Sequence, residues 1–118
     1  MDPVFDFYTP VIIANNTFLA EEPETARAFL DAVSRGYEFA IEHPREAGEI
    51  LCKAAPELDP DLVKASQEYL ADKYQADAPQ WGYIDQERWD AYYAWLNEKG
   101  LTETPIEAGT GCSNEYLP

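Results

Sequence analysis

The chain has 118 residues, of which 46% are hydrophobic and 14% aromatic, a composition typical of one folded domain rather than of a disordered segment. Its 23 acidic and 8 basic residues give a formal charge of -15, which repels nucleic acid phosphates and anionic membrane surfaces. We therefore expect no nucleic-acid partner. The acidic residues are spread among the helical segments, which favours a solvated surface over a cation-binding block.

Two further features bear on where the chain works. No apolar run has the length needed to span a bilayer, and the first residues lack the basic and apolar regions of an export signal. Cys52 and Cys112 lie far apart, without histidines at metal-ligand spacing. We expect two free thiols, with a single disulfide as the alternative, and no metal site.

Residues 8–14 form the one segment that the sequence predicts as a strand. Val11, Ile12 and Ile13 are a β-branched block bounded by a proline and an asparagine. A single strand cannot satisfy its own backbone N–H and C=O groups. We therefore expect Val11 to Ala14 to pair with a second copy of the chain, giving a homo-oligomer, or with the C-terminal tail.

A turn over residues 17–22 leads into the first of four predicted helices, at about 23–42. Pro23 suits the first helical position, where it removes only an N–H that would lack a helical partner. Apolar residues then recur at the three- and four-residue spacing of one buried face. These positions are Ala26, Phe29, Leu30, Val33, Tyr37, Ala40 and Ile41.

Three shorter helices are predicted at about 44–54, 60–74 and 85–99. Their signals are prolines at first positions, aspartates at N-caps and a glycine stop, which are Pro44, Pro60, Asp59, Asp85 and Gly100. The predicted inner faces are Ala47, Leu51 and Ala54, then Leu62, Val63, Ser66, Tyr69 and Leu70, then Trp89, Tyr92, Tyr93 and Leu96. Residues 102–118 contain glycines and prolines and are expected to be extended coil.

The residue types that usually carry catalysis form no recognisable pattern here. His43 precedes a proline and has no cysteine, serine or carboxylate at a catalytic spacing. The six glycines do not form a phosphate-binding loop, and the oxygen-ligand spacing of an EF-hand is absent. We expect a protein that is not an enzyme and uses no cofactor.

Several aromatic rings lie outside the predicted core faces. The linker Gln75–Tyr83 contains Trp81 and Tyr83, and a connection so aromatic is expected to fold back onto the body of the protein. Flat rings with a polar edge suit stacking on a heteroaromatic ligand, although packing in a core is their commoner use. Both interpretations remain open at this point.

Four stretches cover nearly the whole chain from Tyr8 to Pro118: YTPVIIANNTFLAEEPETARAFLDAVSRGYEFAIEHPREAGEIL, APELDPDLVKASQEYL, QADAPQWGYIDQERWDAYYAWLNEKGL and SNEYLP. The order and the amino-acid sequences of these stretches resemble the C-terminal part of solute-binding proteins of ABC importers. The group that they resemble is the family named for fungal thiamine-pyrimidine synthases, whose bacterial members deliver thiamine precursors to a transporter.

The resemblance implies a type 2 periplasmic-binding-protein α/β fold with two lobes. Residues 1–118 would then be a single domain, the C-terminal part of the first lobe, mainly α with one or two short strands. It also implies that Tyr8 and Thr9, where the chain leaves the hinge, and Trp81 and Tyr83, in the aromatic loop, contact the ligand.

By the same resemblance, the complete protein would work outside the cytoplasmic membrane, periplasmic or lipid-anchored, with a permease and a small heteroaromatic solute as partners. A thiamine pyrimidine precursor is the expected solute. The alternatives are another solute, such as a sulfonate or a flavin precursor, and a helical protein-interaction module with no small ligand.

Overall fold

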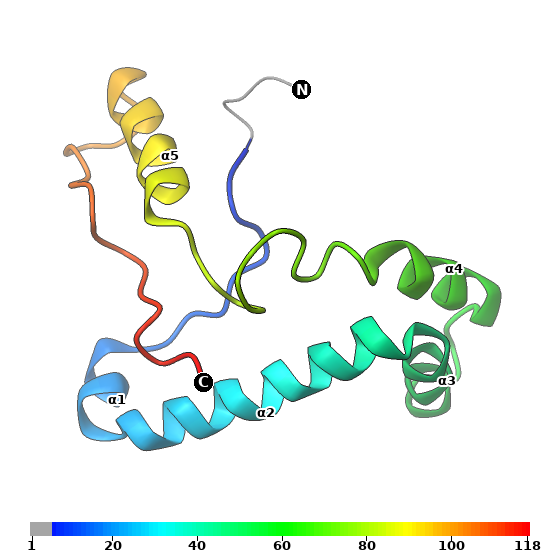
Figure 1. Cartoon of the computed structure of the whole chain (residues 1–118). Helices are drawn as coiled ribbons and strands as arrows, with labels where there is room; N and C mark the ends of the chain where they lie inside the picture. The colour runs from blue at the N-terminus through cyan, green and yellow to red at the C-terminus, as the bar shows by residue number, and fades with distance from the viewer. Residues whose placement is uncertain (1–5) are drawn as a thin grey trace. The chain divides into compact units, whose positions relative to one another are not determined.

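A computed structural model describes residues 6–118, and its regular structure in that range is helical (Figure 1). Among these residues five helices follow one another: α1 (Asn16–Glu21), α2 (Pro23–Glu42), α3 (Pro44–Ala54), α4 (Pro60–Leu70) and α5 (Gln86–Glu98). Within the described residues there is no strand, and no helix is long and apolar enough to cross a membrane.

The chain divides into two compact units. The first unit combines the N-terminal segment, up to Pro23, with residues 84–116, and therefore contains α1, α5 and most of the tail. The second unit runs from Glu24 to Tyr83 and includes the last two residues, Leu117 and Pro118. It contains nearly all of α2, together with α3, α4 and the aromatic linker.

In the second unit, α2 has the bounds that the proline signals indicate, 23–42. Its ring at Tyr37 lies parallel to that of Trp81, with 4.4 Å between ring centroids, and meets Tyr74 edge-on at 5.0 Å. These contacts confirm that the linker after α4 folds back onto a helix. The prediction that Phe29 belongs to the inner face is wrong, because this side chain is exposed.

The helices α3 and α4 pack against each other through a glycine. Gly48 is buried, and a Cβ built on it would lie 3.5 Å from a methyl group of Val63 and 3.6 Å from Gln67. At the edge of this contact, Arg45 Nε lies 2.7 Å from a carboxylate oxygen of Glu68. The small residue lets the two backbones approach closely, so the interface centres on Gly48 and Val63.

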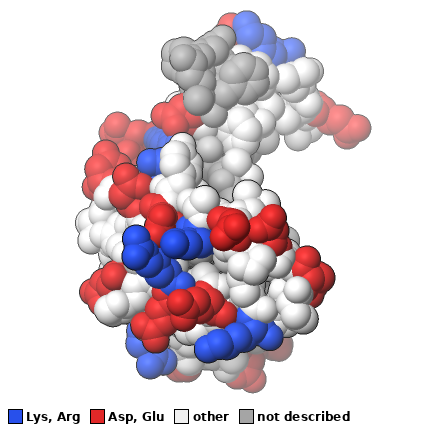
Figure 2. Space-filling model, turned by 90° about the vertical axis from the view of Figure 1, so that its right-hand side faces the viewer, with Lys and Arg blue, Asp and Glu red and all other residues white. Residues whose placement is uncertain are grey.

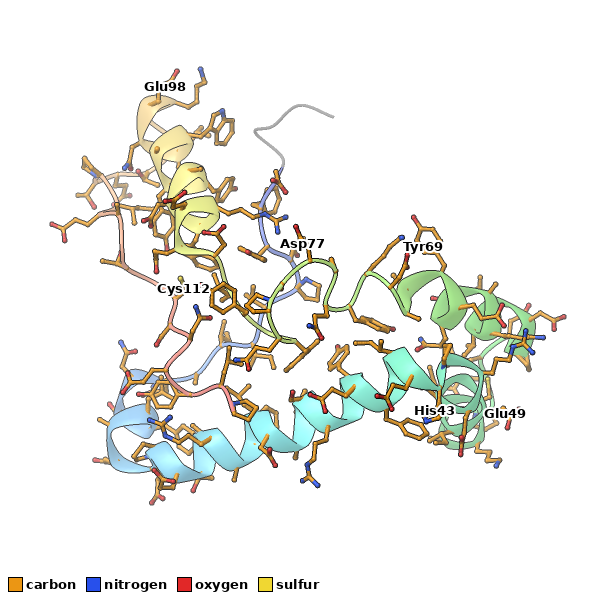
Figure 3. All side chains as sticks on the ribbon, viewed as in Figure 1. His43, Glu49, Tyr69, Asp77, Glu98 and Cys112 are labelled. Carbon is orange, nitrogen blue, oxygen red and sulfur yellow. The ribbon has the colours of Figure 1, made fainter. Side chains whose placement is uncertain are left out.

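The predicted inner faces of these two helices are therefore wrong in part. Leu51 and Ala54 are exposed on α3, while on α4 Leu62 is 68% exposed and Tyr69 is 66% exposed. Tyr69 projects from α4 on the side away from α2 (Figure 3). The apolar spacing indicated faces that could be buried, but the second unit covers only the side next to Gly48.

The helix predicted to reach residue 74 ends at Leu70. Residues 71–73 form turns instead, and Lys73 N–H donates to the Leu70 carbonyl, a tighter three-residue spacing. After these turns the Tyr74 hydroxyl donates to Gln67 Oε1 at 3.2 Å, while its ring meets Tyr37. One contact with α4 itself and one with α2 thus hold the chain where α4 stops.

The predicted strand over residues 8–14 is not formed. Residues 11–15 have no regular structure, and Val11, Ile12 and Ile13 are 42%, 54% and 87% exposed. The predicted pairing with the C-terminal tail is wrong as well, because the tail bonds to α5 and to Ile84. A strand requires a partner edge, and the described chain supplies none.

Immediately after this segment lies α1, where the sequence predicted only a turn. The Asn15 side chain accepts a hydrogen bond from Thr17 N–H at 2.8 Å, and the Glu22 N–H donates back to the Phe18 carbonyl. Asparagine is a strong N-cap, and Pro23 can only begin the next helix. One capped turn and a half therefore fits between residues 15 and 23.

In the first unit, Asp85 caps α5 by accepting from Glu87 N–H at 2.9 Å, and Gly100 follows the helix with φ +62°. The tail beyond has neither helix nor strand, but two asparagines fix it. Asn97 both donates to and accepts from the backbone of Ile106, and Asn114 does the same with Ile84, all at 2.8–2.9 Å. At Ile84 and at Ile106, a side-chain amide thus bonds to both the backbone N–H and the backbone C=O, as a neighbouring strand would in a sheet.

Candidate functional site

Tyr8 is held at the start of α5 by its hydroxyl group. The backbone N–H of Asp85, the N-cap residue, donates to the Tyr8 hydroxyl oxygen at 3.0 Å. In many helices a glutamate at the third helical position accepts this bond. That position is Arg88 here, which has no acceptor, so Tyr8 supplies the oxygen from a distant part of the sequence.

Arg88 covers the ring of Tyr8. Its guanidinium carbon lies 4.2 Å from the ring centroid, and one terminal nitrogen lies 2.5 Å from a carboxylate oxygen of Asp6. Burial acts to lower the pKa of Arg88, but the hydrogen bond with Tyr8 and the negative charge of Asp6 prevail and raise it. The group is therefore a permanent cation, attracted to both the ring and the carboxylate.

An aromatic cluster surrounds these groups on α5. The ring centroids of Tyr8 and Trp89 are 6.4 Å apart, and Phe7 stacks on Tyr92 with ring centroids 4.8 Å apart. Trp89 meets Tyr93 edge-on at 5.9 Å, and Tyr92 lies parallel to Trp95 at 6.0 Å. The prediction that Trp89, Tyr92, Tyr93 and Leu96 turn inward is confirmed, since each is half-buried.

Two polar atoms in this cluster have no hydrogen-bond partner among the described residues. They are Arg88 Nε and Trp89 Nε1, both shielded from solvent. Gly111 in the tail lies against this indole nitrogen and against the Tyr93 hydroxyl, and its φ is +83°. The sequence predictions missed Arg88 and Gly111. The available signals were an arginine where a capping glutamate is usual and two glycines in the tail.

The other three predicted ligand residues have different surroundings. Thr9 is exposed and precedes Pro10 through a cis peptide bond. In the second unit, Trp81 stacks on Tyr37, and Tyr83 is 39% exposed. That Tyr8, Thr9, Trp81 and Tyr83 serve one ligand stays a prediction.

Within residues 6–118 no three His, Cys, Asp or Glu side chains form a metal-binding group. His43 lies between α2 and α3, 3.9 Å from the Glu42 carboxylate and beside the ring of Phe39. A shallow pocket of about 330 Å³ adjoins it, lined by residues 42–46.

Both cysteines are free thiols, as predicted, and each is half-buried. Cys112 lies toward the N-terminal end of α5, remote from Glu98 at the other end (Figure 3). Its sulfur donates to Gln86 Oε1 at 3.5 Å. Burial, and secondarily the charge of Asp90, raise the pKa of Cys112 above its usual range, which favours the unreactive thiol.

Charge is interspersed on the surface of the second unit. In the face shown in Figure 2, basic groups lie beside acidic ones. Among the ion pairs of this unit, Arg45 pairs with Glu68. Arg35 likewise pairs with Asp31 one helical turn away, at 3.2 Å. On that face the acidic residues are therefore interspersed with basic ones rather than gathered in one patch.

Comparisons with known proteins find similarity to proteins that are named for binding small molecules. It is 29% identical over 102 residues to a formylaminopyrimidine-binding protein of Halalkalibacterium halodurans, covering 83% of this chain and 31% of that protein. It is 24% identical over 125 residues to the riboflavin-binding protein RibY of Chloroflexus aurantiacus, covering 98% of this chain and 34% of that protein.

A third relative carries an enzyme name. The 4-amino-5-hydroxymethyl-2-methylpyrimidine phosphate synthase of Candida albicans is 38% identical over 116 residues, which cover 94% of this chain and 31% of that protein. A family model described as NMT1/THI5 like matches residues 1–47. The resemblance to this thiamine-pyrimidine-related family of binding proteins is thereby confirmed. The chain spans about a third of the length of the curated relatives it matches.

Proposed function

We propose that the chain is the C-terminal part of one lobe of an ABC-importer substrate-binding protein whose solute is a small heteroaromatic molecule. A pyrimidine precursor of thiamine is the proposed solute. The observation that carries the proposal is the similarity to two binding proteins, which extends over 83% and 98% of the chain and therefore includes the helices of both units.

Uncovered apolar side chains support the idea of a lobe that extends beyond this chain. The buried hydrophobic residues of the described part are Ala26 and Val63, whereas large apolar groups face solvent on several elements. These are Val11, Ile12, Ile13, Phe18, Phe29, Phe39, Ile50, Leu51, Leu58, Leu62, Tyr69, Tyr83 and Leu101. Exposed apolar surface of this extent is typical of an interface, and the rest of a two-lobed protein is the proposed cover.

The proposed ligand contacts are Tyr8, Thr9, Trp81 and Tyr83. Tyr8 suits a contact with a flat solute because its ring orientation is fixed at both the hydroxyl and the face. Its hydroxyl oxygen already accepts a bond, so the hydroxyl proton remains for an acceptor on the solute. A ring nitrogen of an aminopyrimidine is such an acceptor.

In the proposed setting the complete protein works outside the cytoplasmic membrane and delivers its solute to a permease. It has no enzymatic step of its own. One relative is named a synthase, so the absence of catalysis needs a direct test. Incubating the protein with pyridoxal phosphate and looking for an imine absorption band is that test, and a band lost on substitution of a lysine would contradict the proposal.

The binding proposal is tested by calorimetric titration with formylaminopyrimidine and with 4-amino-5-hydroxymethyl-2-methylpyrimidine. The measurement is made on the 118-residue chain and on the longest gene product that contains it. Saturable heat with either pyrimidine, reduced in Tyr8→Ala but not in Tyr69→Ala, supports the proposal. Heat no greater than dilution with both proteins would sink the proposed ligand.

Two specific observations favour alternatives. The similarity to RibY favours a flavin, and riboflavin in the same titration separates it from a pyrimidine. The exposed apolar residues of α4 favour a helical interaction module without a small ligand. A module predicts association, so light scattering that shows a monomer at all concentrations would count against it.

A further inference from the structure

The N-terminal segment Asp6–Tyr8 contacts α5 only through side chains in the contacts described above. Asp6 pairs with Arg88, Phe7 stacks on Tyr92, and the Tyr8 hydroxyl accepts from Asp85 N–H. No regular backbone pairing joins this segment to the helix, because residues 6–9 are in neither helix nor strand. The attachment is therefore a set of discrete side-chain bonds.

These bonds share partners. Arg88 contacts both Asp6 and the ring of Tyr8, while Tyr8 contacts both Arg88 and the N-cap residue Asp85. If the ion pair opens, the guanidinium loses the group that holds it over the ring. If the hydroxyl leaves Asp85, the ring moves away from the guanidinium. Loss of any one contact thus weakens the next.

The chain that follows the segment does not hold it through regular structure. Residues 9–15 have no regular structure, and every one of them is exposed. Side chains of the pair itself are partly open to solvent, at 63% for Asp6 and 38% for Arg88. Elements with exposed bonds and few buried contacts are the ones that open locally in native proteins.

We infer that Asp6–Tyr8 is a strap that opens and closes on the start of α5 as one cooperative unit, with Arg88 joining its parts. When the strap opens, Asp85 N–H loses its acceptor and the face of Trp89 next to Tyr8 becomes accessible. The far end of α5 stays folded, because Asn97 is bonded to Ile106 independently of the strap. The strap therefore controls access to one aromatic face.

Amide hydrogen exchange measured by NMR tests this inference on the 118-residue chain, with Asp85 N–H as the direct reporter. The variants are Tyr8→Phe, which removes only the hydroxyl, Arg88→Ala, and the double variant. Each single change should raise the exchange rate of Asp85 N–H by about five- to tenfold, the effect of losing one hydrogen bond. In one cooperative strap the double variant should exchange within about threefold of the faster single variant.

The control is Arg35→Ala, which removes a comparable exposed ion pair on α2 and should leave Asp85 unchanged. Rates that multiply in the double variant would show independent contacts and overturn the inference. So would an equal rise at amides of α3 and α4, which would report global unfolding. If Arg88→Ala does not fold, Arg88→Lys replaces it, since lysine keeps the ion pair but not the planar stacking.

Discussion

The two units show different ways of fixing a helix. In the second unit, α3 and α4 approach closely around Gly48 and Val63, so packing of apolar atoms positions them. In the first unit α5 has no fully buried residue, and bonds from Asp85, Asn97 and Asn114 with stacked rings hold it and its tail. A helix without a core can therefore be ordered by polar side chains, at the cost of depending on a few of them.

The largest effect is expected at Gly111, in the first unit. A Cβ there would overlap the Tyr93 hydroxyl, and φ +83° is strained for any side chain. Gly111→Ala should lower the free energy of unfolding by about 2–4 kcal/mol, combining backbone strain with overpacking. Urea unfolding measures it. The matched control is Gly109→Ala, with φ +77° but open space, which should lose only about 1–2 kcal/mol. Equal losses would contradict the packing account.

A smaller effect is expected at Asn114, whose amide satisfies both backbone groups of Ile84. Asn114→Ala should cost about 1–3 kcal/mol, since the backbone groups of a half-buried residue lose their partners. Asn114→Asp keeps the acceptor for Ile84 N–H and should recover part of the loss. An aspartate variant no more stable than the alanine variant would show that these bonds contribute little.

In the second unit, Gly48→Ala is expected to change the stability in the opposite direction to Gly111→Ala. The added methyl would sit at ordinary contact distance, 3.5 Å from Val63, and alanine is the better helix former by about 0.5–1 kcal/mol. We expect stability to be unchanged or to rise by up to that amount. A loss above about 1 kcal/mol in urea unfolding would mean that α3 and α4 cannot separate even slightly. Comparing the stability changes of Gly48→Ala and Gly111→Ala then distinguishes packing that adjusts to an added methyl group from packing that does not.

The ion pair between Arg45 and Glu68 should matter least. Both side chains are exposed, so Glu68→Gln should change stability by less than about 1 kcal/mol. The remaining difference should shrink when salt is raised to about 1 M, where charges are screened within about 3 Å. A larger loss that salt leaves unchanged would show that the pair is shielded from solvent.

The thiol of Cys112 provides a pH test of the first unit. Because burial raises the pKa of Cys112, its thiolate should form only at a pH above that at which an ordinary cysteine ionises. Alkylation at pH 7–8 should therefore be slow. The rate should increase as pH rises through that higher pKa. The same chain in urea is the control, with its midpoint at lower pH. Coinciding pH profiles would contradict the burial of this sulfur.

Local signals predicted the helices well, whereas features that depend on distant partners were missed. The prolines at 23, 44 and 60 and the N-cap aspartates at 59 and 85 act within one turn, and the helices begin where they indicate. The prediction of a strand over residues 8–14 was wrong because a strand forms only beside another edge. Tyr8 was a predicted contact residue, but its bond to Asp85 spans 77 positions, and no local pattern encodes that pairing.

The side-chain amides of Asn97 and Asn114 also determine where substitutions are tolerated. Each amide bonds only to backbone atoms, so the hydrogen bonds at Ile84 and Ile106 place no demand on those side chains beyond excluding proline, which lacks an N–H. Asn97 and Asn114 cannot be exchanged so freely, because few side chains both donate and accept at that reach. The path of the seventeen-residue tail, residues 102–118, is thus fixed chiefly by two residues, Asn97 and Asn114.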